Sequence, residues 1–273
     1  MAWWAIRIRA VCVLALLAPG AIAEGVVADL PLPDGVRPFT APIELAYANN
    51  DRFTFVFRSD IEDPSGRRVI AEGWVMDGTM RREAEDVMWS YRLSNIGRDA
   101  VERERGSLRV TTDPWGVVRQ ARLVEDRWAR PGQQPGVADS LFNEQNLAFP
   151  LCCCPRGPIR MGDALHMPLT TLTMPPSDLP AIPPPPEMPD MQLQFRGRST
   201  AVGILDVDGR RHLVVRHEAE ARTTSSQPDG FVMRRSGYTL LDTRNCMPRR
   251  SVWRSRYEHR GGVMTMWQSQ TMR

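Results

Sequence analysis

Lysine is absent from this sequence, and all 35 of its basic residues are arginine. They are balanced by 32 acidic residues, so the formal net charge is only +3. Nucleic-acid-binding proteins carry a larger basic excess, clustered on one face. The composition therefore predicts no nucleic-acid partner. A GC-rich bacterial genome explains the arginine bias more simply than a preference for guanidinium groups as planar anion binders.

The common signatures of catalysis are also missing. The sequence contains no nucleophile elbow, phosphate-binding loop or dinucleotide fingerprint. His217-Glu218 begins like a zinc-protease helix motif, but the second histidine is absent and the segment alternates like a strand, which sends successive side chains to opposite faces. His217 lies beside Val215 and Ala219 on the apolar side, which predicts a buried neutral histidine with a hydrogen-bond partner. We expect a non-enzymatic protein without a cofactor.

Long apolar runs are confined to the N-terminus. Residues 1–23 have the order of a secretory signal, with Arg7 and Arg9, an apolar run over 10–18, and the small-residue cleavage site Ala21-Ile22-Ala23. The apolar run is too short for a stable membrane anchor. We therefore expect a periplasmic or secreted protein after signal removal, and not an integral membrane protein.

Alternating segments fill much of what remains. From 191 to 272, four or five runs place apolar residues at every second position, with polar residues between them. A period of two is typical of strands with one buried and one solvated face. Asp208-Gly209, between two such runs, suits a hairpin turn. We predict an all-β protein with minor helix, built as a curved antiparallel sheet or half-barrel of long meandering strands.

The N-terminal part repeats this pattern less regularly. A strand is expected over 51–59, and its partner over 67–76, followed by a turn at Asp77-Gly78. Three further segments are expected to be helical or irregular: 81–87, 98–105 and 137–147, of which 137–147 is the best helix candidate.

A cysteine- and proline-rich segment interrupts the alternation. Pro183 to Pro186 must be extended and cannot donate ladder hydrogen bonds, which is typical of a surface connector. We therefore expect an N-terminal strand array over 24–148, a connector over 149–190 and a C-terminal strand array over 191–273, together forming one domain.

Four cysteines follow the signal: Cys152, Cys153, Cys154 and Cys246. An exported protein meets an oxidising compartment, so we expect a disulfide from the triplet to Cys246, and the sequence leaves open which triplet member takes part. The alternative is a metal or redox site. Met161, His166 and Met167 follow the triplet, and thioether, thiolate and imidazole ligands suit a soft ion such as Cu(I). Their spacing matches no structural zinc pattern.

Six arginines are expected on one face of the C-terminal strands: Arg196, Arg198, Arg216, Arg222, Arg254 and Arg256. Such a face could hold anionic head groups or an acidic partner. The simpler interpretation is a solvated face that Glu218 and Glu220 neutralise by cross-strand pairing.

Three short segments carry a resemblance to known proteins: Phe149-Pro150-Leu151, Ile159-Arg160-Met161-Gly162-Asp163 and Tyr238-Thr239-Leu240-Leu241-Asp242. With the export signal and the proline-rich middle, they resemble a class of secreted bacterial β proteins of uncharacterised function. The pattern is also similar to the half-barrel carriers that ferry lipoproteins or lipids across the periplasm. This resemblance implies a curved antiparallel sheet around an apolar cavity.

The leading expectation is an exported, non-enzymatic envelope protein that binds an amphipathic or apolar ligand, such as a lipid or lipoprotein, inside the curve. Candidate lining residues, which would equally serve as a plain core, are Phe53, Phe55, Phe57, Trp89, Leu193, Phe195 and Trp253. Two alternatives stay open: a periplasmic metal-binding or redox protein that uses the cysteine triplet, and a structural or partner-binding protein without a small ligand. A partner-binding protein should expose an apolar patch or an open sheet edge.

Overall fold

The computed structural model describes residues 30–47, 50–62, 68–96, 102–113, 118–126, 157–165, 171–174, 191–223, 232–259 and 262–273. Every regular element within these ranges is a strand, and twelve strands form one antiparallel sheet. The strands are β1 (Asn50–Glu62), β2 (Arg68–Glu83), β3 (Asp86–Ile96), β4 (Glu102–Thr112), β5 (Val118–Asp126), β6 (Ala164–Leu165), β7 (Thr171–Met174), β8 (Met191–Val207), β9 (Arg210–Thr223), β10 (Val232–Asp242), β11 (Pro248–His259) and β12 (Gly262–Met272).

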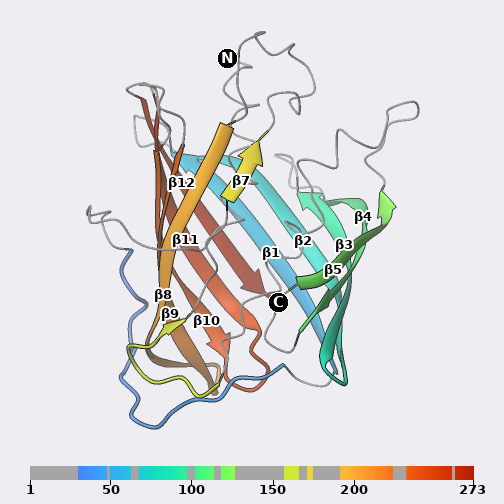
Figure 1. Ribbon diagram of the computed structural model, residues 1–273, viewed down its shortest axis with the longest axis vertical. Helices are drawn as coiled ribbons and strands as arrows, with labels where there is room; N and C mark the ends of the chain where they lie inside the picture. The colour runs from blue at the N-terminus through green and yellow to red at the C-terminus, as the bar shows by residue number, and fades with distance from the viewer. Residues whose placement is uncertain are drawn as a thin grey trace.

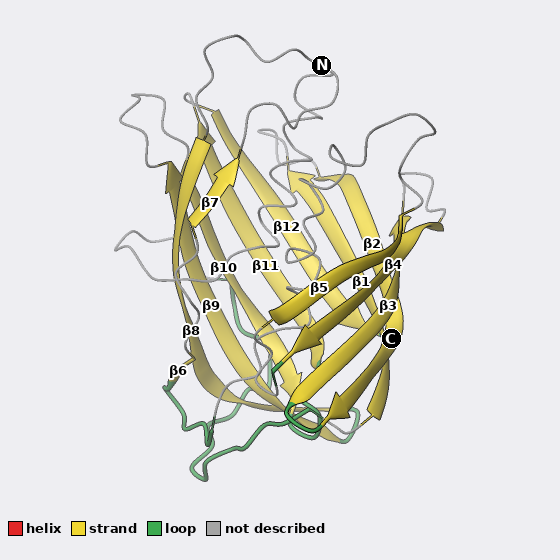
Figure 2. Ribbon diagram, turned by 45° about the vertical axis from the view of Figure 1, so that its right-hand side comes forward, coloured by secondary structure: helices red, strands yellow, loops and turns green. Residues whose placement is uncertain are grey.

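The sheet joins the two ends of the chain. Its order is β5-β4-β3-β2-β1-β12-β11-β10-β9-β8, and the short strands β6 and β7 both pair with β8. Each half is a meander of neighbouring strands, and the halves meet where β1 pairs with β12, from Phe55–Met272 to Glu62–Thr265. Figure 1 shows the sheet bent into an open trough whose walls are the two halves, and Figure 2 shows the same curvature from another side. The predicted curved antiparallel sheet is therefore confirmed.

The predicted turn at Asp208-Gly209 is correct. It links β8 to β9 through two residues with positive φ, 52° at Asp208 and 70° at Gly209. Positive φ at both central residues is the requirement of a type I′ turn, whose twist matches the strands that it joins.

The predicted turn at Asp77-Gly78 is wrong, because both residues lie in the middle of β2. A Cβ atom on Gly78 would lie 2.3 Å from the carbonyl oxygen of Ser90 and 2.5 Å from the Cβ of Tyr91. Glycine is therefore required here for close approach of β3, and it does not reverse the chain.

Residues 81–87, and the described residues of 98–105, are strand or turn and not the expected helical or irregular structure. Between β2 and β3 the chain turns at Ala84–Glu85, so 81–87 forms the tip of a hairpin. Of the charged segment, Glu102 to Glu104 belong to β4 and pair with β3. The predicted helix over 137–147 lies outside the described residues.

Residues 30–47 wrap around the β8 end of the sheet (the blue segment in Figure 1). Leu30, Leu32 and Val36 pack against one face of β9 and β10. Arg37 then forms an antiparallel bridge with Ile204 of β8. Further along, Leu45 and Tyr47 are buried in the main hydrophobic cluster on the opposite face. This segment therefore covers both faces and part of the edge that lies between them.

The two edges of the sheet differ. β8 is covered by β7 at Met191–Gln194, by β6 at Ser199 and Thr200, and by the bridge at Ile204. Within the described residues, β5 pairs with β4 alone. Its exposed side chains include Arg119, Arg122 and Glu125. Charges on an edge strand oppose pairing with another chain.

Candidate functional site

The inner face of the sheet is the face that carries Phe53, Phe55 and Phe57. Residues directly opposite one another in antiparallel strands share a face, so the pairing extends this face from strand to strand. Phe57 pairs with Gln270 of β12, which pairs with Ser251 of β11. The inner face therefore continues without a break from the N-terminal half, β1 to β5, to the C-terminal half, β8 to β12.

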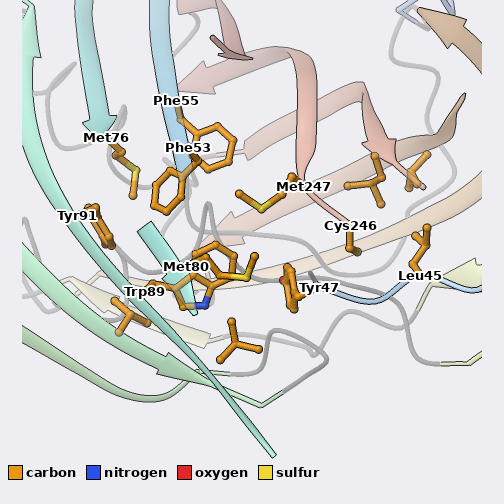
Figure 3. Packing of buried hydrophobic residues seen from close by; sticks show 14 of the residues in the cluster. Leu45, Tyr47, Phe53, Phe55, Met76, Met80, Trp89, Tyr91, Cys246 and Met247 are labelled. Atoms are coloured by element: carbon orange, nitrogen blue, oxygen red, sulfur yellow. The ribbon is translucent and has the colours of Figure 1, made fainter. Parts of the chain in front are cut away.

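In the N-terminal half the inner face is apolar. Its buried members are Phe53, Phe55, Phe57, Met76, Met80, Trp89, Tyr91, Leu93, Leu108 and Val110. Figure 3 shows the aromatic and methionine side chains packed together, with Tyr47 of the wrapping segment against them. The ring of Trp89 lies edge-on to Tyr47 and to Phe53, at centroid distances of 5.1 and 5.7 Å. Its indole nitrogen donates to the Thr112 hydroxyl at 3.2 Å, so the polar atom is satisfied.

In the C-terminal half the inner face is rich in polar side chains. Its polar members are Ser199, His217, Arg235, Thr239, Ser251, Ser255, Gln268 and Gln270. His217 is partly buried, and each of the other seven is almost fully buried. Buried polar groups are costly unless they are hydrogen-bonded, so their concentration on one wall is a specific feature.

A row of hydrogen bonds crosses four strands of this half. The Ser199 hydroxyl lies 2.7 Å from Nδ1 of His217, and Nε2 of His217 lies 2.8 Å from the Thr239 hydroxyl, which donates to Ser251 at 2.9 Å. Because Thr239 donates its hydrogen to Ser251, it accepts from Nε2–H of His217, and Nδ1 then accepts from Ser199. Burial, and secondarily the nearby Arg235 charge, lowers the pKa of His217 to about 3.

The geometry of His217 gives it a structural role. Hydroxyls occupy both of its ring nitrogens, and a pKa of about 3 makes it a weak base at neutral pH. The predicted hydrogen bonding of this histidine on the inner face is confirmed, its side chain is partly buried, and its lowered pKa agrees with a neutral imidazole. Glu218 lies on the opposite face and pairs with Arg198 at 3.3 Å, so the two residues do not share a site.

Arg235 and Trp253 form a pair on the same inner face, which sequence reasoning missed. The guanidinium carbon of Arg235 lies 4.7 Å from the centroid of the Trp253 ring, a cation–π distance. Gly237 makes room for the ring, because a Cβ atom there would lie 2.6 Å from Cδ1 of Trp253. Alternation in β10 places Arg235 on the same side as Met233 and Gly237, but this position by itself does not indicate that an arginine is buried.

The predicted lining residues whose side chains the structure describes all lie on the inner face. Phe53, Phe55, Phe57 and Trp89 are buried, whereas Trp253 is only partly buried. The side chains of Leu193 and Phe195 lie outside the described part of the structure. Their backbones pair with Thr223 and Ala221 in the register that continues the inner face. The backbone positions of the proposed lining residues thus span both halves of the inner face.

Cys246 is buried next to the apolar cluster and is disulfide-bonded. Cys152, Cys153 and Cys154 lie outside the described residues, so their pairing with Cys246 stays a prediction. Of the other candidate metal ligands, Met161 is 49 % exposed, and His166 and Met167 also lie outside the described part. Among the residues that the structure describes, no three His, Cys, Asp or Glu side chains come together as a metal site.

The arginine-rich outer face is partly neutralised, as the simpler interpretation predicts. Glu218 pairs with Arg198, and Glu220 lies 3.5 Å from Arg234, which the sequence analysis did not include. Arg254 stacks on Trp267 with its guanidinium carbon 5.2 Å from the ring centroid. The side chains of Arg196 and Arg222 lie outside the described residues.

The sequence matches no model of a known protein family and no curated protein. Within the described ranges, no helix is long and apolar enough to span a membrane. The function must therefore be inferred from the inner face itself.

Proposed function

We propose that this chain is an exported, non-enzymatic envelope protein, periplasmic or secreted, that binds an amphipathic or apolar ligand such as a lipid or lipoprotein on the inner face of its curved sheet. The observation that carries the proposal is the division of that face. The wall formed by β1 to β4 is aromatic and methionine-rich, whereas the wall formed by β8 to β12 combines buried apolar residues with a group of buried polar side chains that includes an arginine. Ligand sites combine apolar walls with a few placed polar groups.

The chemistry of the face supports binding rather than catalysis. The histidine on the inner face is held by two hydroxyls and has a pKa of about 3, so it is poorly suited to accept a proton at neutral pH. Methionine side chains adapt their shape to different apolar groups, which suits a carrier of flexible chains. Both features agree with a protein that holds its ligand unchanged.

Native mass spectrometry of protein purified from the periplasm, without detergent or reductant, tests this proposal. We expect a co-purifying mass that organic extraction identifies as lipid, or an added mass after incubation with lipid vesicles. A bare mass in both experiments contradicts the proposal and favours a structural or partner-binding protein. An added mass of copper or zinc that chelation removes favours the metal-binding alternative.

A matched pair of tryptophans localises the binding. Trp253 on the inner face and Trp267 on the outer face lie on neighbouring strands, each is partly buried, and each has an arginine stacked on its ring. Trp253→Ala should lower ligand occupancy, whereas Trp267→Ala should leave it unchanged while the circular dichroism spectrum stays native. Equal loss in both variants would contradict binding on the inner face.

A further inference from the structure

We propose that the outer face of the N-terminal half docks an acidic protein segment through Arg109 and Arg122, which lie directly opposite each other on β4 and β5. This docking surface lies on the side of the sheet opposite the proposed ligand-binding face. Binding there does not require a ligand on the inner face.

Five exposed residues form one row across the outer face, from β1 to β5. The pairing joins Arg52 to Thr79, Thr79 to Ser90, Ser90 to Arg109, and Arg109 to Arg122. Residues directly opposite one another share a face, so the row carries three guanidinium groups, two hydroxyls and no carboxylate. Four strand-to-strand steps separate its ends, which is about 19 Å at about 4.8 Å per step.

Arg109 and Arg122 face each other without a counter-ion. Both are exposed, and neither forms an ion pair or hydrogen bond through its side chain within the described part of the chain. On the same strand, in contrast, Arg119 lies 2.9 Å from Asp86. Like charges directly opposite in a sheet are destabilising, so this pair disfavours the free protein. Two adjacent guanidinium groups suit carboxylates, because each can donate paired N–H groups to one carboxylate.

The charges beside the row favour a protein partner over an anionic membrane. The next row on the same face consists of Thr54, Asp77, Arg92, Ser107 and Glu125. Its two carboxylates repel a uniformly negative surface, whereas an acidic segment can place its carboxylates on the arginine row alone. The outer face of the trough is also convex (Figure 2), so a flat bilayer contacts only a narrow part of it.

A synthetic peptide probes this surface. The probe is a fluorescent ten-residue peptide of alternating glutamate and threonine, whose carboxylates lie on one side when the peptide is extended. A peptide of alternating glutamine and threonine is the neutral control. Fluorescence anisotropy with the full mature chain reports the affinity, which should weaken as salt screens the charges.

Two double variants remove the same charge from different places. The test variant combines Arg109→Gln with Arg122→Gln. The control variant combines Arg119→Gln with Arg198→Gln, because both of these arginines are about half exposed and each already has a carboxylate partner.

We expect the test variant to bind the acidic peptide about 10- to 100-fold more weakly than wild type, and the control variant to lose less than about threefold. The melting temperature of the test variant should stay the same or rise, because the like-charge pair is gone. A purely structural role for the two arginines would instead lower the melting temperature and leave the peptide affinity unchanged.

Three results would overturn the docking surface. The first is a wild-type chain that does not bind the acidic peptide, or binds the neutral one equally. The second is an equal loss of peptide affinity in both double variants. The third is arginine-dependent binding to phosphatidylglycerol vesicles without binding to the peptide, which would identify a membrane as the occupant. If the test variant does not fold, Arg122→Gln alone decides, and an unchanged peptide affinity overturns the proposal.

Discussion

The two walls of one continuous face are built on different principles. Around Trp89, stability comes from the burial of large apolar groups and from edge-to-face aromatic contacts. Around His217, hydrogen bonds between short polar side chains connect four strands. The comparison shows that the same strand alternation can build either lining, because alternation assigns a face and leaves its chemistry to individual residues.

The largest effect is expected in the apolar wall. Trp89 is 1 % exposed, and Trp89→Ala leaves a cavity beside Tyr47 and Phe53. The free energy of unfolding should therefore fall by about 3–5 kcal/mol. Urea titration followed by circular dichroism measures this change. Met88→Ala is the control, because Met88 lies on the outer face of the same strand and is 37 % exposed. A shift of equal size in both variants would mean that the inner face is not the main core.

The polar wall should respond to pH. His217 has a pKa of about 3 when folded and an ordinary value of 6.5, so between these values the unfolded chain binds a proton that the folded chain does not. The contribution of neutral His217 to stability is therefore present above pH 6.5 and decreases as pH falls toward 3, by up to about 1.4 kcal/mol per pH unit.

His217→Gln isolates this effect. The variant should be less stable than wild type at pH 7 by about 1–3 kcal/mol, because the Ser199 and Thr239 hydroxyls lose their partner. The urea midpoints of the wild type and of His217→Gln, measured at pH 7, 6, 5 and 4, should approach each other as pH falls. Only the wild type loses the stability contributed by the neutral histidine. Parallel curves over this range would show that His217 is not buried as a neutral group.

Substitutions of glycine test whether both walls depend on the close approach of a neighbouring strand to a glycine. Gly78→Ala and Gly237→Ala each place a Cβ atom 2.3 Å from a carbonyl oxygen of the next strand. Each substitution should therefore lower the free energy of unfolding by about 1–3 kcal/mol. Gly73→Ala is a milder control, because its nearest contacts are 3.1 and 3.2 Å. Thermal unfolding compares the three variants. If Gly237→Ala alone is tolerated, the close approach matters only in the apolar wall.

The smallest effect is expected outside both walls, at Asp77 on the outer face. Hydrogen bonds from Thr54 and then Arg92 lower the pKa of the Asp77 carboxyl, and partial burial opposes them. Asp77→Asn should cost at most about 1 kcal/mol at pH 7, because the group is solvent-screened. The lowered pKa makes this contribution present above the ordinary value of 3.8 and lost as pH falls through the folded value. Urea midpoints that still differ at pH 2 would contradict this origin.

Local patterns predicted the parts of the fold that depend on neighbouring residues. Alternation located most of the long strands, and Asp208-Gly209 located its hairpin because its positive φ angles suit these residue types. Asp77-Gly78 shows the limit of the same reasoning, since there the glycine serves a close contact with Tyr91. The same Asp-Gly dipeptide occurs in both places. The local sequence therefore does not distinguish a glycine in a turn from a glycine that allows a neighbouring strand to approach closely.

The candidate site was predictable only in part. The phenylalanines of β1 and Trp89 were identified by their shared face, and they are buried on the inner face. Arg235 was missed because a charged residue at an apolar register position gives no local sign that it is buried. Its 4 % exposure and its stacking on Trp253 depend on how β10 and β11 pair and on what packs over them.

The sequence by itself determined which residues of each strand share a face, because successive side chains of a strand point in opposite directions. Only the tertiary structure decided that β1 pairs with β12 and therefore that Phe57 meets Gln270. That register depends on hydrogen bonds between segments from opposite ends of the chain, and such long-range pairings have no local signal. The boundary between the apolar and polar walls is a product of this pairing.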